Sequence, residues 1–256
     1  MTILERAAPW FAGFVALILW DVIVRVFDLP AYLVPSPSSV LREIINRWSD
    51  LLYASLWTSL EIWAGFGLAV LVGLGLGIPI AYSKILENSI LPLVVILQVI
   101  PKVAVAPIFL IWLGYGLSPK ILVACLIAFF PILINTIKGL RTVEVELVQW
   151  IGTLGASRLQ LFAKLALPWS LPYVFAAMKV GITFAVVGAV VGEFVGADRG
   201  LGYLLLASTN VLDTKLTFAA LVVLSLIGMI SYWIILLAER WIIPWQQSLE
   251  EPTATT

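Results

Sequence analysis

Long apolar runs separated by short polar stretches dominate this sequence. A helix needs about 20 consecutive, mainly apolar residues to cross the hydrocarbon core of a bilayer. By this criterion the pattern predicts six transmembrane helices, at 9–27, 52–81, 90–113, 121–137, 172–195 and 216–237. We therefore expect an all-α integral membrane protein in which residues 1–256 form a single transmembrane domain.

The first polar stretch, residues 28–52, predicts one short helix. Pro35 and Pro37 oppose a helix at their own positions, and Ser38 or Ser39 is suited to cap a short amphipathic helix that follows on the membrane surface. The C-terminal tail, residues 241–256, ends in a polar stretch that is predicted to be disordered. No small-residue cleavage site follows the first apolar run, which favours a retained span over a removed signal peptide.

Composition supports the membrane assignment and excludes several classes of function. Hydrophobic residues make up 62% of the chain, against about 45–50% in soluble domains. The net charge of zero provides no basic field for a nucleic acid. The chain has no histidine, and its single cysteine, Cys125, lies in an apolar run, so we predict neither a metal site nor catalytic residues.

The segment 139–168 differs from the rest because it is long, charged and amphipathic. Its apolar residues recur at helical spacing in two groups, Leu147, Ile151 and Leu154, then Leu159, Phe162 and Leu165. Between the groups lies Gly155, a residue suited to a sharp turn. The pattern predicts two short helices that meet at a small-residue corner and form a knob suited to a groove in a partner. An interfacial hairpin without a partner is the alternative.

Ionisable residues and prolines inside the predicted spans are candidates for a translocation pathway. Pro101 and Lys102 lie within the third span, where proline kinks a helix and an inserted lysine costs about 2.5–3.5 kcal/mol. Lys102 is therefore expected to face protein, water or a ligand, unless it snorkels to the membrane surface. Glu61 of the second span is a further candidate.

The fifth span carries small residues along one face, at Gly181, Ala185, Gly188, Gly192 and Gly196. This spacing allows close helix packing, and a role for Gly188 and Gly192 in the pathway is the alternative. Glu193 lies beside this face and is a functional candidate as an intramembrane acid. Its partner is expected to be Arg199 or Lys102.

The spacing within the charged segment resembles a known family. Gly155, nine residues, Leu165, one residue and Leu167-Pro168 are similar to the EAA loop of ABC importer permeases. Further stretches, among them VPSPSSV, IPKVAVAPIFLIWLGYG and VVGEFVGADRGLGYLL, resemble the nitrate/sulfonate/taurine branch. The resemblance implies a type I ABC importer permease fold with a cytoplasmic EAA-loop coupling helix seated on an ATPase subunit. The implied coupling residues are Glu146, Leu154, Gly155, Ala156, Ser157, Arg158 and Leu159.

One position departs from the family pattern. The Glu-Ala-Ala triplet is replaced by Gln149, Trp150 and Ile151. The acidic contact is therefore missing at its usual place, and Glu146, one helical turn earlier, could replace it. Trp150 is much larger than the alanine it replaces, so we expect the docking groove or the local packing to differ.

The resemblance also implies partners and a location. No lysine follows a glycine, so the chain lacks a phosphate-binding loop and is expected not to bind and split ATP by that route. The resemblance implies that the chain is not itself an enzyme and binds no cofactor of its own. ATP and Mg are then bound by two ABC ATPase subunits, which assemble with this chain, a second permease copy in a homodimer and a solute-binding protein or lipoprotein. The assembly lies in lipid, in a bacterial inner membrane, with both termini cytoplasmic.

The substrate implied by this branch is a small anion such as nitrate, bicarbonate, a sulfonate or taurine. A thiamine-precursor pyrimidine or a flavin, carried by the same machine, is the alternative. The buried acids also fit an ion-coupled secondary carrier, although the chain shows no inverted repeat and such a carrier has no need of the knob.

Overall fold

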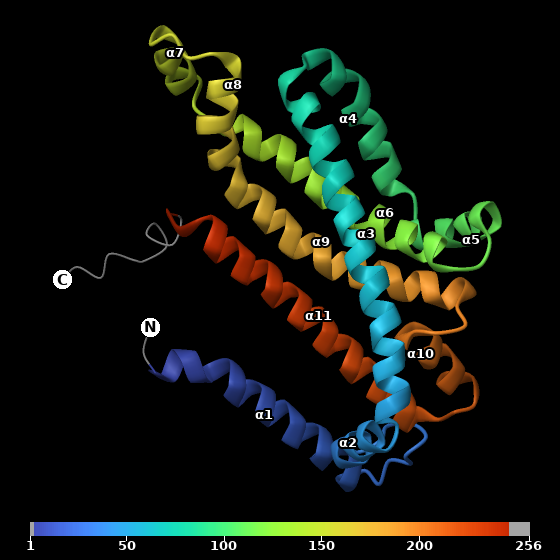
Figure 1. Ribbon diagram of the computed structural model, residues 1–256. Helices are drawn as coiled ribbons and strands as arrows, with labels where there is room; N and C mark the ends of the chain where they lie inside the picture. Colours follow the sequence, from blue (N-terminus) through green and yellow to red (C-terminus); the bar gives the residue numbers. More distant parts are fainter. Residues whose placement is uncertain (1–2, 246–256) are drawn as a thin grey trace. The chain divides into compact units, whose positions relative to one another are not determined.

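The computed structural model describes residues 3–245, with side chains described from residue 11, and every regular element in that part is helical. Figure 1 shows their course. The elements are α1 (Ile3–Val26), α2 (Pro37–Asn46), α3 (Trp48–Tyr82), α4 (Lys84–Val99), α5 (Lys102–Leu113), α6 (Leu117–Arg141), α7 (Val145–Thr153), α8 (Arg158–Leu161), the π-helix η1 (Phe162–Ala166), α9 (Leu167–Gly196), α10 (Leu201–Asn210) and α11 (Thr214–Ile242). Most of the predicted tail, residues 246–256, lies outside the described part.

Four stretches of helix are long and apolar enough to cross a membrane: Trp48–Tyr82, Leu117–Arg141, Arg158–Gly196 and Thr214–Ile242. They contain the predicted spans 52–81, 121–137, 172–195 and 216–237. A fifth crossing is possible if α4 and α5 count as one broken span. The first predicted span, 9–27, falls almost entirely in α1. The side chains of α1 are described only from residue 11, so the total of six crossings stays a prediction.

The predicted third span, 90–113, is not a single helix. Helices α4 and α5 are bent by 98° relative to each other, and Ile100 and Pro101 separate them. Pro101 has no backbone N–H to continue the α4 hydrogen-bond ladder, so the chain turns there and α5 begins. At the end of α5 the chain turns again through Gly114, whose φ of +74° favours glycine.

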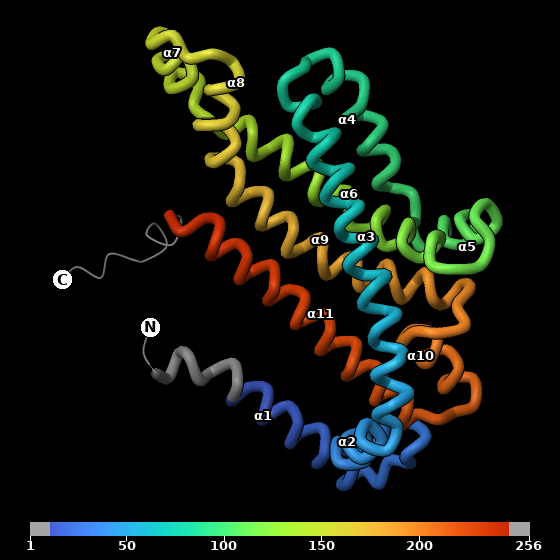
Figure 2. The backbone as a smooth tube through the Cα atoms, in the orientation of Figure 1, coloured from blue at the N-terminus to red at the C-terminus, as the bar shows by residue number. Residues whose placement is uncertain are grey.

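Two compact units divide the chain, Met1–Thr58 with Asp198–Leu226 and Ser59–Ala197 with Ile227–Thr256. Figure 2 traces the backbone through both units by residue number. In the first unit, the rings of Trp20 and Phe218 pack at 5.7 Å between centroids. The hydroxyl of Thr58 accepts a hydrogen bond of 2.8 Å from the backbone N–H of Leu201 and thereby ties α3 to the start of α10.

The amphipathic helix expected after residue 37 is present as α2, but its predicted start is wrong. Ser36, rather than Ser38 or Ser39, is the N-cap, and its hydroxyl accepts from the N–H of Ser39 at 3.4 Å. Pro37 is the first residue of the helix. Proline is favourable at this position because its missing N–H would have no partner there anyway.

The second unit is organised around the close packing of α6 with α9. A Cβ added to Gly188 of α9 would lie 2.5 Å from the Cα of Ala124 on α6. A Cβ added to Gly65 of α3 would lie 2.5 Å from the Cβ of the same alanine. Ala124 is fully buried, so three helices meet around one small residue. The close helix packing predicted from the small-residue face of the fifth span is what the structure shows.

Candidate functional site

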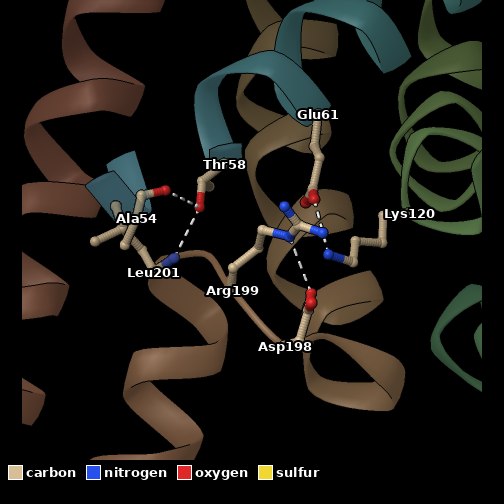
Figure 3. Close-up of polar contacts among 7 residues, drawn as sticks. All are labelled: Ala54, Thr58, Glu61, Lys120, Asp198, Arg199 and Leu201. Atoms are coloured by element: carbon tan, nitrogen blue, oxygen red, sulfur yellow. Dashed lines mark hydrogen bonds and ion pairs between the residues drawn. The ribbon is translucent and has the colours of Figure 1, made fainter. Parts of the chain in front are cut away.

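Two features of the second unit are candidates for function: a buried charge cluster, made of Glu61, Lys120 and Glu193, and the hairpin formed by α7 and α8. In the charge cluster, the ammonium group of Lys120 on α6 donates to Oε1 of Glu61 on α3 at 3.0 Å (Figure 3). Glu193 of α9 is the other acidic neighbour of Glu61. The exposed fractions of the three residues are 0%, 3% and 1%.

Backbone packing explains how these charges come together. Gly192 precedes Glu193, and a Cβ at that glycine would lie 2.9 Å from the Cα of Lys120. Because α9 approaches the backbone of α6 so closely there, Glu193 enters the same buried region as Lys120. A buried ion pair is costly to leave incomplete, since removing one member strands the charge of the other.

Sequence reasoning selected Glu61, Gly188, Gly192 and Glu193 but missed Lys120. The predicted span began at residue 121, just after this lysine, whereas α6 begins at Leu117. The missed signal is Pro119, which is favourable in the first turn of a helix. Lys120 therefore lies within α6 and is buried.

Pro101 and Lys102, the other pathway candidates, lie at the break between α4 and α5. Pro101 is the N-cap of α5 and is exposed. The ammonium group of Lys102 donates to the carbonyl of Gln98 at 3.2 Å and lies 4.9 Å from the ring centroid of Phe130. Two partners were expected for Glu193. Lys102, the first, instead contacts Gln98 and Phe130, and Arg199, the second, forms an ion pair with Asp198 at 3.1 Å.

The hairpin has the predicted two helices and corner. Helix α7 ends at Thr153, the chain turns at Gly155 with φ of +84°, and α8 begins after Ser157. The Ser157 hydroxyl accepts from the N–H of Gln160 at 3.3 Å, and the Gln160 side chain accepts from the N–H of Ser157 at 2.8 Å. This capping box fixes the start of α8.

The corner of the hairpin presents apolar side chains to its surroundings. Leu154 is 74% exposed and Leu159 is 75% exposed, one on each side of Gly155. Leu154 also lines a groove of about 380 Å³, together with Gly155, Ala156 and Lys164 among others. Exposed apolar side chains on a rigid turn are typical of a contact surface for another protein.

The remaining predicted coupling residues are exposed, on α7 or at the start of α8. Glu146 is in the first turn of α7, and Arg158 opens α8. Gln149 and Trp150, which replace part of the family triplet, are also exposed. The large ring of Trp150 therefore lies outside the core.

The root of the hairpin is fixed by polar contacts at the end of α6. Arg141 forms an ion pair with Glu87 of α4, in which Nη2 donates to Oε2 at 2.7 Å. The same guanidinium donates to the carbonyl of Ala81 at the end of α3. Arg141 thus joins the end of α6 to α3 and α4, just before the chain enters the hairpin.

Comparison with known proteins places the chain in a family. The family model described as binding-protein-dependent transport system inner membrane component matches residues 69–244. The chain is 33% identical over 244 residues to the formylaminopyrimidine transport permease protein of Halalkalibacterium halodurans, with 95% of this chain and 97% of the relative covered. It is 38% identical over 237 residues to the riboflavin transport system permease protein of Chloroflexus aurantiacus, with 91% and 87% covered.

A third relative and a solved structure agree with this assignment. The chain is 30% identical over 249 residues to the putative aliphatic sulfonates transport permease protein of Bacillus subtilis, with 94% and 90% covered. A structure of the MetNI methionine ABC transporter in an inward-facing conformation has a similar fold, with a TM-score of 0.68, 19% identity, and 77% and 98% covered. Since the family model matches more than half of the chain, this protein belongs to the ABC permease family of binding-protein-dependent transport system inner membrane components.

Proposed function

We propose that this ABC importer permease receives the force of ATP hydrolysis through the α7–α8 hairpin and uses it to move a small anion across the membrane. The observation that carries the coupling role is the exposed apolar corner at Leu154, Gly155 and Leu159. A helical knob with apolar side chains and a small-residue turn is suited to a groove in a partner. The partner in this proposal is an ABC ATPase subunit.

The structure supports a rigid connection between such a partner and the membrane helices. The capping box at Ser157 fixes the start of α8, and α8 continues through η1 into α9. Helix α9 in turn packs along α6. A displacement of the hairpin would therefore be transmitted to the helices that enclose the charge cluster, as alternation between two openings requires.

The proposed assembly holds two ATPase subunits, two copies of this chain and a solute-binding protein or lipoprotein. ATP and Mg would be bound by the ATPase subunits, with no cofactor on this chain. Among the described residues no cluster of His, Cys, Asp or Glu suits a metal ion. The hairpin and both termini would face the cytoplasm from the inner membrane.

A small anion is favoured by Lys102, whose positive charge lies at the break between α4 and α5. Non-helical backbone at membrane depth is tolerated where it is buried in protein or lines a water-filled cavity, and a cation there attracts an anion. The relative named for aliphatic sulfonates fits this choice. A heteroaromatic solute is the second candidate, because the formylaminopyrimidine and riboflavin permeases are also similar to this chain.

The coupling proposal is tested by Gly155→Trp, with co-purification of the ATPase subunit and ATP hydrolysis stimulated by the binding protein as readouts. Gly114→Trp is the matched control, because Gly114 also has a positive φ and open space around it. We expect Gly155→Trp to lose the ATPase subunit and the control to retain it. Normal association and stimulation in Gly155→Trp would contradict the proposal.

The substrate proposal is tested separately, by uptake into proteoliposomes that contain the complete transporter and its binding protein. Taurine, nitrate and a formylaminopyrimidine are compared in wild type and Lys102→Gln. We expect uptake of an anion, reduced by the substitution. ATP-dependent uptake of the pyrimidine alone would refute the small anion and leave the permease assignment intact, whereas uptake that needs an ion gradient and no ATP would restore the carrier alternative.

A further inference from the structure

A groove between α4 and α6 lies outside the charge cluster and the corner of the hairpin. Its volume is about 370 Å³. The side chains that line it are apolar or basic, with one hydroxyl: Leu91, Ile134, Ile137, Lys138, Arg141 and Thr142. Such a lining suits an amphiphilic ligand that carries a negative charge.

The groove lies at the end of a helix that is long and apolar enough to cross a membrane. Helix α6 ends at Arg141, and Lys138 belongs to its last turn. Basic side chains at the ends of membrane helices extend to the level of the lipid headgroups. Ile134 lies one turn before Lys138 and therefore deeper in the membrane. The groove thus extends from the headgroup level towards the acyl chains.

The basic end of the groove has a positive charge that the protein does not neutralise. Arg141 forms an ion pair with Glu87. Lys138 is exposed, and no ion pair in the described part of the chain includes it. The next charges along the chain, Lys84 at the start of α4 and Glu144 after α6, cancel each other. One positive charge therefore remains, which one singly charged anion would neutralise.

The apolar wall of the groove continues along α4. Leu91 and Ile134 pack against the buried cluster that contains Ile137. Val95 and Val99 follow Leu91 at intervals of four residues, so they lie on the same face of α4, and they are 53% and 80% exposed. From Leu91 to Val99 this face extends over about 12 Å. It provides a surface along which one acyl chain can lie.

We propose that the groove binds one anionic phospholipid, with its phosphate between Lys138 and Arg141 and an acyl chain along Leu91 and Ile134. Phosphate oxygens accept charge-assisted hydrogen bonds from ammonium and guanidinium groups. Basic pockets between membrane helices are typical binding sites for anionic headgroups. A lipid fits better than a soluble phosphate, because a soluble phosphate would leave the apolar wall without a partner. The bound lipid would join α4 to the end of α6, just before the hairpin.

The test is native mass spectrometry of the purified full-length chain in detergent. The lipids added are dioleoyl phosphatidylglycerol, which is anionic, and dioleoyl phosphatidylcholine, which has no net charge. We expect one phosphatidylglycerol to stay bound per chain at concentrations at which phosphatidylcholine does not. Lys138→Gln should weaken phosphatidylglycerol binding about fivefold, the loss expected for one basic residue near an anionic lipid. Lys138→Arg should retain the affinity, because it restores the charge.

Lys164→Gln is the matched control. Lys164 is also exposed and has no ion pair in the described part of the chain, but it lines the groove at the hairpin corner. Its substitution removes the same charge and should leave the affinity for phosphatidylglycerol unchanged. A second measurement needs no variant: added salt should weaken phosphatidylglycerol binding to the wild-type chain, because it screens the exposed lysine.

Several results would overturn the proposal. Equal binding of the two lipids, or equal affinities in Lys138→Gln and Lys164→Gln, would show that Lys138 does not hold a headgroup. Displacement of the lipid by glycerol phosphate at the same concentration would show a site for a soluble phosphate instead. A dimer of the chain that holds no lipid would show that a second copy covers the groove. The test involves neither an ATPase subunit nor a transported solute, so its failure would leave the proposed function unaffected.

Discussion

Substituting Gly188 by alanine tests the packing on which the second unit depends. The new Cβ would lie 2.5 Å from the Cα of Ala124, 3.0 Å from its backbone nitrogen and 3.1 Å from the carbonyl oxygen of Val123. These are all backbone atoms, so no side chain can rotate away. Helix α9 must instead move away from α6.

The magnitude follows from ordinary contact distances. Carbon atoms pack favourably at about 3.5–4.0 Å, so relief of the clash requires a shift of about 1 Å or more. Overpacking of this kind costs about 1–3 kcal/mol. With about 2–4 °C lost per kcal/mol for a chain of this size, the midpoint of thermal unfolding should fall by about 2–12 °C.

The assay is thermal unfolding of the purified protein in detergent, followed by tryptophan fluorescence. Gly75→Ala is the matched control, because Gly75 also lies within a membrane helix but has no atom within 4 Å of its added Cβ. Its midpoint should stay the same or rise, since alanine favours a helix over glycine. Equal midpoints for Gly188→Ala and Gly75→Ala would refute the packing argument.

A double substitution sharpens this test. The Cβ added in Gly65→Ala would clash with the Cβ of Ala124, whereas the Cβ added in Gly188→Ala would clash with the backbone of Ala124. Ala124→Gly should therefore partly restore the stability of Gly65→Ala but not that of Gly188→Ala. Rescue of both variants would show that the backbone contact is not the source of the cost.

Two further substitutions test other contacts. Ser157→Ala removes the capping box of α8 and should destabilise the start of this helix by about 1 kcal/mol. The backbone amides of residues 158–162 should then exchange their hydrogens about five times faster. Unchanged exchange rates there would contradict the role of the cap. Lys179→Met leaves Glu239 without its ion-pair partner between α9 and α11, and both side chains are mostly buried. It should lower the unfolding midpoint more than Lys84→Met, a lysine for which the described residues show no ion pair, and an equal effect would contradict a stabilising pair.

The sequence predicted the helical class and the places of the long spans because hydrophobic runs are local signals. Where the runs are long, as at 52–81 and 216–237, the observed helices α3 and α11 contain them and extend beyond them by one to five residues at each end. The corner at Gly155 was also predictable, since two amphipathic groups flank a glycine. Such signals depend on neighbours along the chain.

Features that depend on contacts between distant residues could not be predicted in this way. Glu61 and Lys120 are 59 positions apart, and their pairing depends on how α3 packs against α6. The 98° bend between α4 and α5 follows from Pro101 only in part, because proline marks a break but does not fix its angle. Both features are consequences of tertiary packing.

The π-helix η1 was not predicted, although the sequence contains a signal for it. Pro168 has no backbone N–H to bond to the carbonyl of Lys164, so an α-helical ladder cannot continue through it. The wider turn of η1 just before it bonds the N–H of Leu167 to the carbonyl of Phe162 instead. The irregularity thus lies where the hairpin joins the membrane helix α9, a place where π-turns often accompany function.

The small-residue face of α9 and the charge cluster are parts of one arrangement, although the sequence presented close packing and a role in the pathway as alternatives. Gly188 brings α9 against Ala124, and Gly192 brings it against Lys120 one turn further on. Without that approach Glu193 would not reach the region where Glu61 and Lys120 meet. Gly192→Ala should therefore lower the midpoint of thermal unfolding more than Gly75→Ala does, because its added Cβ would lie 2.9 Å from the Cα of Lys120 and 3.2 Å from its Cβ. Equal midpoints in the two variants would show that the cluster forms independently of the glycine face.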